Sequence, residues 1–115
     1  MMRLLYISLG LAVLTQSANA ADIESGKNLF AQRCATCHGT LGAGDGPVAQ
    51  GLPADQKPRN LISGEMKFAT DDEKLKKVLK EGGQAVGLSP LMPPQPDLSQ
   101  GDIDSLALFV KSLKK

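Results

Sequence analysis

Two cysteines and a histidine lie within five residues of one another, and this cluster constrains the chain more than any other feature. Cys34-Ala35-Thr36-Cys37-His38 has the spacing C-x-x-C-H. The pattern is typical of c-type haem attachment, in which two cysteine sulfurs bond the haem vinyl groups and the histidine binds the iron. We therefore predict one covalent haem c, attached at Cys34 and Cys37, with His38 as the proximal iron ligand.

Two other chemistries use similar residues. Thiol oxidoreductases carry C-x-x-C beside a βαβ pattern, which this sequence lacks. A structural zinc ion takes four ligands, and Cys34, Cys37 and His38 are the only cysteines and histidine in the chain. Both alternatives are weaker than haem attachment.

The first 20 residues have the order of a secretory signal peptide. Arg3 precedes an apolar run from Leu4 to Leu14, and small residues follow up to Ala20, as expected for such a signal. The run is far shorter than the roughly 20 apolar residues that span a bilayer. We predict cleavage after Ala20, no stable membrane insertion, and one mature domain over residues 21–115. An uncleaved anchor is the alternative.

Charge and aromatic content narrow the function classes. Without Arg3 the chain keeps 12 of its 13 basic residues against 12 acidic ones, so the mature polypeptide is formally neutral and we expect no nucleic-acid partner. It has no Trp and three Phe. A small domain with few large aromatic side chains has a limited core, which a bound porphyrin would supplement.

Hydrophobic periodicity predicts three helices. Apolar or small residues recur every three or four positions from Ile23 to Cys37, which predicts one helix carrying both cysteines. Residues 70–73 have the capping-box form S/T-x-x-E, beginning at Thr70, ahead of an apolar stripe that Gly82 ends. Ser99 precedes a last amphipathic run that reaches the C-terminus.

The segments between these helices are long and rich in Gly and Pro, over residues 39–58 and 84–96. They predict loops without helix or strand, and loops of this size tend to be functional; here they would wrap the haem. No strand-like alternation stands out, so the predicted class is all-α.

A sixth iron ligand has to come from a residue type other than histidine. The mature chain has two methionines, Met66 and Met92, and a thioether opposite the histidine raises the reduction potential of cytochromes c. Met92 lies in a proline-rich segment, residues 89–94, whose fixed φ angles would hold it rigidly. We predict Met92 as the distal ligand; a space-filling role is its alternative, and Met66 lies in a polar stretch.

Three passages resemble the small bacterial class I cytochromes c, especially those that carry electrons to periplasmic nitrite reductases or terminal oxidases. They are the C-x-x-C-H motif, Gly46-Pro47 nine residues after the histidine, and the stretch from Gly83 to Pro94 before a terminal helix. The resemblance implies the all-α cytochrome c fold, with three main helices and long Gly/Pro-rich loops around one haem. It also implies a periplasmic electron carrier rather than an enzyme, with redox proteins as donor and acceptor.

The resemblance also implies roles for residues around the haem. The carbonyl of Pro47 would accept a hydrogen bond from the outer nitrogen of His38, and the amide of Gln95 would contact the methionine sulfur. Arg59, in the wrapping loop, is a candidate partner for a haem propionate, with an ordinary solvated arginine as the alternative.

Two further contacts concern packing and charge. In this family the first and last helices cross, so Gly26 and Phe30 would meet Leu106 and Phe109. Four lysines on the second predicted helix either form a docking patch for an acidic partner or, as we favour, pair with Asp72 and Glu73 on a solvated face: Lys74, Lys76, Lys77 and Lys80.

A haem with both axial positions filled offers electron transfer alone, which favours a one-electron carrier. The alternative is an open-site haem protein, or a haem-bearing subunit of a periplasmic oxidoreductase system, in which Met92 does not bind iron.

Overall fold

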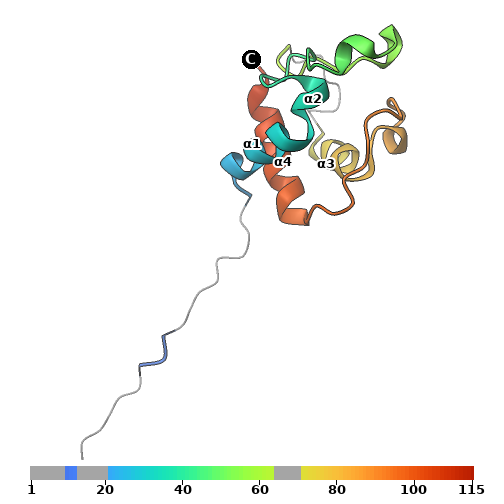
Figure 1. Cartoon of the computed structure of the whole chain (residues 1–115). Helices are drawn as coiled ribbons and strands as arrows, with labels where there is room; N and C mark the ends of the chain where they lie inside the picture. Colours follow the sequence, from blue (N-terminus) through green and yellow to red (C-terminus); the bar gives the residue numbers. More distant parts are fainter. Residues whose placement is uncertain (1–9, 13–20, 64–70) are drawn as a thin grey trace, which may run out of the picture.

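The computed structural model describes residues 10–12, 21–63 and 71–115. Four α-helices follow one another along the chain, α1 (Ile23–Arg33), α2 (Ala35–His38), α3 (Asp72–Glu81) and α4 (Gln100–Leu113) (Figure 1). Three 3-10 turns lie between them, η1 (Ala49–Gly51), η2 (Ala54–Gln56) and η3 (Gln84–Val86). The described residues contain no strand, which confirms the all-α class.

Some predictions concern residues outside these ranges. Most of the predicted signal, residues 1–9 and 13–20, lies outside the described residues, and so do Met66 and Thr70. Among the residues that are described, no helix is both long and apolar enough to cross a membrane.

Helices α1 and α4 cross in close contact, as predicted. The Asp22 carboxylate caps α1 by accepting from the backbone amides of Glu24 and Ser25. At the crossing, a Cβ on Gly26 would overlap the carbonyl oxygen of Ser105, so only glycine allows this approach. The rings of Phe30 and Phe109 pack beside it with centroids 5.2 Å apart.

The first helix ends earlier than predicted. We predicted one helix through Cys37, but α1 ends at Arg33 and Cys34, at φ −116°, separates it from α2. The amide of Cys34 still donates to Phe30 and that of His38 to Cys34. Because these i to i−4 hydrogen bonds persist on both sides of the break, the apolar periodicity does not reveal it.

Helix α3 lies where it was predicted, although its N-cap is Asp71, one residue after the predicted start of the capping box. The Asp71 side chain caps it by accepting from the Lys74 amide at 3.2 Å, and Gly82 follows its last residue with a φ of 87° that suits glycine. Leu75 and Val78 are buried on its inner face together with Leu79.

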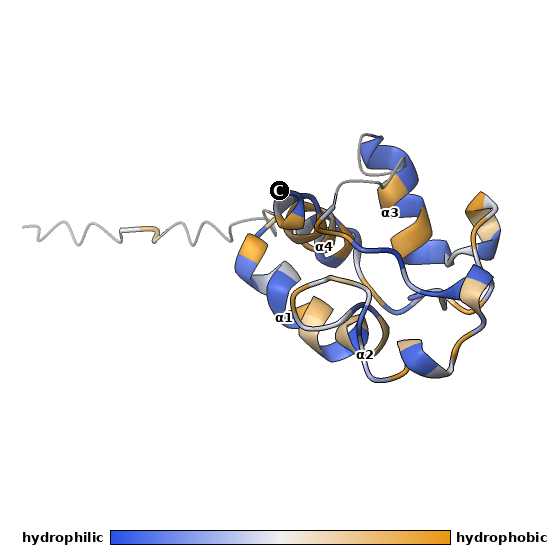
Figure 2. Cartoon of the chain, turned by 90° about the horizontal axis from the view of Figure 1, so that it is seen from above, coloured by the Kyte–Doolittle hydropathy of each residue, from blue (hydrophilic) through white to orange (hydrophobic). Residues whose placement is uncertain are grey.

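Helix α4 completes the core. Ser99 and Asp102 form a reciprocal capping box at its start, and its inner face is buried along the predicted stripe, through Ile103, Leu106 and Val110. Apolar and polar bands alternate along α3 and α4 (Figure 2). An ion pair also joins the two helices. Lys76 of α3 pairs with Asp104 of α4 at 3.1 Å, as well as with Asp72 of its own helix at 2.8 Å.

The two long loops lie where they were predicted. The first one folds back on α2, where the amides of Gly46 and Val48 donate to the carbonyls of Cys37 and Thr36. The second one runs from α3 to α4 and contains Met92. The 3-10 turns η1, η2 and η3 were not predicted, since single turns carry too few residues for a period.

Candidate functional site

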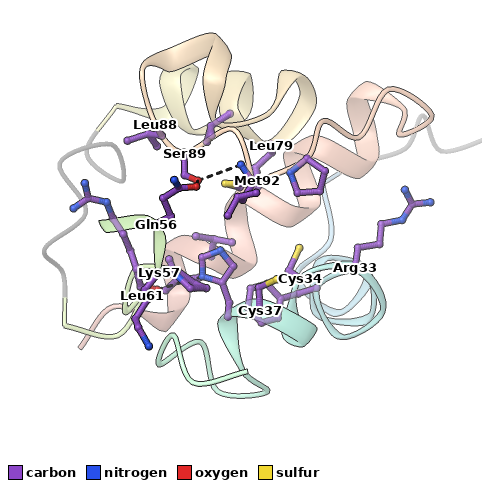
Figure 3. Close-up of a pocket in the computed structure, with 18 of the residues that line it drawn as sticks. Arg33, Cys34, Cys37, Gln56, Lys57, Leu61, Leu79, Leu88, Ser89 and Met92 are labelled. Carbon is purple, nitrogen blue, oxygen red and sulfur yellow. Dashed lines mark hydrogen bonds between the residues drawn. The ribbon is translucent and has the colours of Figure 1, made fainter. Parts of the chain in front are cut away.

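A cavity of about 390 Å³ opens between the first helices, α3 and the two loops (Figure 3). This volume is in the range of pockets that hold small organic ligands or cofactors, roughly 300–1,000 Å³. Buried core side chains also form the apolar wall of this cavity, namely Phe30, Leu61, Leu75, Val78, Leu79, Leu106 and Val110.

The chemistry of this wall fits a large apolar group. Native cores leave few voids larger than a water molecule, so an apolar cavity of this size suits a bulky, flat, hydrophobic occupant. The polar part of the lining includes Cys34, Cys37 and His38, and charged side chains from the loops: Asp55, Lys57 and Arg59. The residues present therefore fit a haem.

Both cysteines line the cavity from the side of α1 and α2, as free thiols. Burial raises the pKa of the Cys34 thiol to about 11, so this thiol is protonated and neutral near pH 7. Reactive cysteines of thiol oxidoreductases have lowered pKa values instead. No three Cys, His, Asp or Glu side chains of the described residues group as a metal site.

His38 also lines the cavity, and its ring is held from behind by the backbone. Nδ1 lies 3.2 Å from the carbonyl oxygen of Arg59. Because a carbonyl only accepts, Nδ1 carries the proton and Nε2 keeps its lone pair. Burial lowers the pKa of His38, so the ring is neutral near pH 7, as a metal ligand requires.

This hydrogen bond corrects the prediction for Pro47. We expected the carbonyl of Pro47 to hold His38, whereas the carbonyl of Arg59 does so and Pro47 is exposed. The amides on both sides of Pro47, of Gly46 and Val48, donate to the end of α2. The segment around Pro47 therefore points its N–H groups toward α2, and the carbonyl that accepts from His38 comes from Arg59, later in the same loop.

Met92 reaches the cavity from the opposite side, on the loop between α3 and α4 (Figure 3). Its carbonyl accepts from the Gly83 amide at 3.0 Å, and its own amide donates to Ser89 at 3.3 Å. A Cβ at Gly82 would lie 3.0 Å from the Met92 carbonyl oxygen. The end of α3 thus supports the backbone that carries this thioether.

The two remaining predicted residues also line the cavity. Gln95 uses its amide oxygen to accept from Arg33 at 2.8 Å, and its contact with the methionine sulfur stays a prediction. Arg59 is exposed at the rim and supplies its carbonyl to His38, while a role of its guanidinium toward a propionate also stays a prediction.

Sequence reasoning missed two polar contacts at this site. Arg33 binds Gln95 and Asp97, and the Ser89 hydroxyl lies 3.4 Å from the Gln56 side chain, joining the two loops. No local sequence signal marks these pairs, because their members are 33 or more positions apart.

Two of the lysines of α3, Lys76 and Lys80, make polar contacts within the protein. The predicted Asp72–Lys76 pair is confirmed, at 2.8 Å. Within the described residues Glu73 and Lys77 form no ion pair, whereas the ammonium group of Lys80 donates to the carbonyls of Pro96 and Leu98.

Known proteins are similar to this chain in sequence and in fold. The family described as cytochrome C oxidase, cbb3-type, subunit III matches residues 21–110. Cytochrome c-554(547) from Halothiobacillus neapolitanus is 32% identical over 98 residues, which cover 83% of this chain and all of that protein.

Solved structures agree. A chain of the Kuenenia stuttgartiensis reducing HAO-like protein complex superposes with a TM-score of 0.64 at 27% identity, covering 81% of this chain and 43% of that one. Cytochrome c6 from the diatom Phaeodactylum tricornutum shares the fold, with a TM-score of 0.52 at 20% identity over 79% of this chain and 92% of that one. This chain therefore belongs to the cytochrome c family, whose members are electron-transfer proteins with covalent haem c, and carries a single attachment motif.

Proposed function

We propose that the protein is a one-electron carrier in which Cys34 and Cys37 attach the haem, and His38 and Met92 bind its iron from opposite sides. The observation that supports this proposal is that Met92, from the loop between α3 and α4, and His38, from α2, line the same apolar cavity. With both axial positions filled, the site offers no open coordination position for a substrate.

The chain's own residues prepare this site for electron transfer. The carbonyl of Arg59 orients the ring of His38 and holds its proton on Nδ1. The backbone of Gly83 fixes the loop of Met92, and the apolar wall excludes water. The haem supplies the redox-active iron, and Arg59 at the rim would face its carboxylates.

Export and partners belong to this proposal. The signal-like order of residues 1–20 supports a periplasmic location after cleavage behind Ala20. Redox proteins would serve as donor and acceptor. The match to a chain of the HAO-like complex, of which this chain spans 43%, favours a second form of the same function, as a haem-bearing subunit of an oxidoreductase assembly.

The distal ligand is tested by the absorption spectrum of the ferric protein. A weak far-red band accompanies methionine ligation of ferric haem, so the wild type is expected to show it and Met92→Ala to lose it. Met66→Ala is the matched control and should keep the band. If Met92→Ala keeps the band and Met66→Ala loses it, Met66 is the ligand.

Attachment and export are tested together by intact mass. We expect the exported protein to have the mass of residues 21–115 plus one haem, and Cys34→Ser/Cys37→Ser to lack the haem mass. A wild-type mass that equals the polypeptide alone would contradict covalent attachment, and a retained segment 1–20 would favour the uncleaved anchor.

A further inference from the structure

Arg33 joins the wall of the cavity that carries the cysteines to the loop that carries Met92. It is the last residue of α1 and stands directly before Cys34. Its guanidinium donates to both carboxylate oxygens of Asp97, at 2.9 and 2.6 Å, and to the amide oxygen of Gln95 at 2.8 Å. These partners are 64 and 62 positions away in sequence, and the two-pronged geometry fixes direction as well as distance.

The hydrogen bonds of Arg33 are the side-chain link between the cysteine-bearing helices and the Met92 loop in the described residues. Across residues 21–63 and 71–115, no other side-chain hydrogen bond links α1 or α2 with the segment 82–98. The same segment is also bonded to α3. The backbone amide of Gln95 donates to the Lys80 carbonyl at 3.0 Å, and the Lys80 ammonium group donates to the carbonyl of Pro96 at 3.2 Å.

The chain between Met92 and Gln95 is stiff. It consists of Pro93 and Pro94, whose rings lock φ. A displacement of Gln95 is therefore passed on to the backbone of Met92 rather than absorbed between them.

We propose that Arg33 is a positioning residue that holds the Met92 thioether at bonding distance from the haem iron. The proposal rests on the function proposed above. Arg33 acts through Asp97 and Gln95 and needs no contact with the iron. The ion pair lies at the surface, with side chains 31% and 62% exposed, so its effect is modest and comes from its bidentate geometry and shared network.

Competition by free imidazole measures how strongly Met92 is kept on the iron. Imidazole added to the ferric holoprotein displaces a methionine ligand, and loss of the far-red band reports the apparent dissociation constant. If the loop is less rigid, Met92 competes less well for the iron, and the protein binds imidazole more tightly. We expect Arg33→Gln to tighten imidazole binding about fivefold, the scale of a bidentate surface ion pair.

Three further variants separate positioning from other roles. Lys27→Gln removes one exposed cation from the same helix and should leave imidazole binding unchanged. Asp97 is not part of the cavity lining, so Asp97→Asn acts through Arg33 and should match Arg33→Gln. The double variant should show about the same fivefold change rather than the product of the two.

The inference is overturned if Arg33→Gln behaves like Lys27→Gln, or if Arg33→Gln changes imidazole binding while Asp97→Asn does not, because Arg33 would then only block access. A purely structural role would lower the unfolding temperature without changing the imidazole constant. Failure of the proposed function is distinguishable, because the wild type itself would then lack the far-red band.

Discussion

At the scale of single residues, the ring of His38 depends on a loop backbone held by glycine. Gly44 lies against the backbone of Pro58 and Arg59, and its own amide donates to the His38 carbonyl at 2.7 Å. A Cβ at Gly44 would come within 2.7 Å of the Pro58 carbonyl oxygen and 3.3 Å of Arg59. Gly44 also has a φ of 81°, which residues other than glycine rarely adopt.

Gly44→Ala is therefore expected to lower the free energy of unfolding by about 1–3 kcal/mol, the usual scale for a strained backbone position. Denaturant titration of the holoprotein measures it. Gly51→Ala is the control, since a Cβ there meets nothing within 4 Å. Equal stability of the two variants would show that Gly44 does not support the Arg59 carbonyl.

Residues whose chemistry is local could be predicted from the sequence, and residues chosen by loop geometry could not. The spacing of Cys34, Cys37 and His38 is itself the signal. The acceptor for His38 is 21 positions away, and whether Pro47 or Arg59 supplies it depends on which way the loop backbone turns.

At the scale of elements, the crossing of α1 and α4 depends on Gly26. Replacing it by alanine places a methyl group on the Ser105 carbonyl oxygen, so the helices have to separate. We expect Gly26→Ala to cost about 1–3 kcal/mol of unfolding free energy, as overpacked cores do, read from thermal or denaturant unfolding. Asn28→Ala, exposed on the same helix, should be close to neutral. A stable Gly26→Ala would mean that the crossing is looser than described.

The ion pairs between α3 and α4 predict a pH dependence. Hydrogen bonds from Lys111 and Lys76 lower the pKa of Asp72 below its ordinary value of 3.8. The folded state therefore favours the carboxylate, and the stabilisation is present above pH 3.8 and is lost as the pH falls through the lowered value.

Asp72→Asn should accordingly flatten the fall in unfolding free energy with acid below pH 3.8. The effect is small because the side chain is 44% exposed, and high salt should reduce it. Glu73→Gln, in the same helical turn, serves as control. Identical acid profiles for wild type and Asp72→Asn would refute the contribution of this pair.

Elements with strong caps and long apolar stripes were predictable, as α3 and α4 show. The N-cap of α3 is Asp71, one residue after the Thr70 with which the predicted capping box begins, because several neighbouring polar residues can cap. The break at Cys34 escaped prediction because the helical hydrogen bonds resume directly after it.

At the scale of the whole molecule, the apolar cavity belongs to the core. Phe30, Leu79 and Leu106 are buried in the core and also line the cavity, so the domain packs fully only around a large apolar group. The all-α class and the need for such a group follow from composition and periodicity. The positions of the two walls relative to each other are set by long-range contacts such as Arg33 with Asp97, which no short segment encodes.

Closure of the sixth iron position by Met92 separates an electron carrier from a ligand-binding haem protein. Carbon monoxide added to the reduced protein near neutral pH tests it most directly, with Met92→Ala as the positive control. We expect the absorption spectrum of the wild type to stay unchanged while that of Met92→Ala shifts on binding the gas. Rapid carbon monoxide binding by the wild type, equal to that of Met92→Ala, would contradict a closed His38/Met92 site.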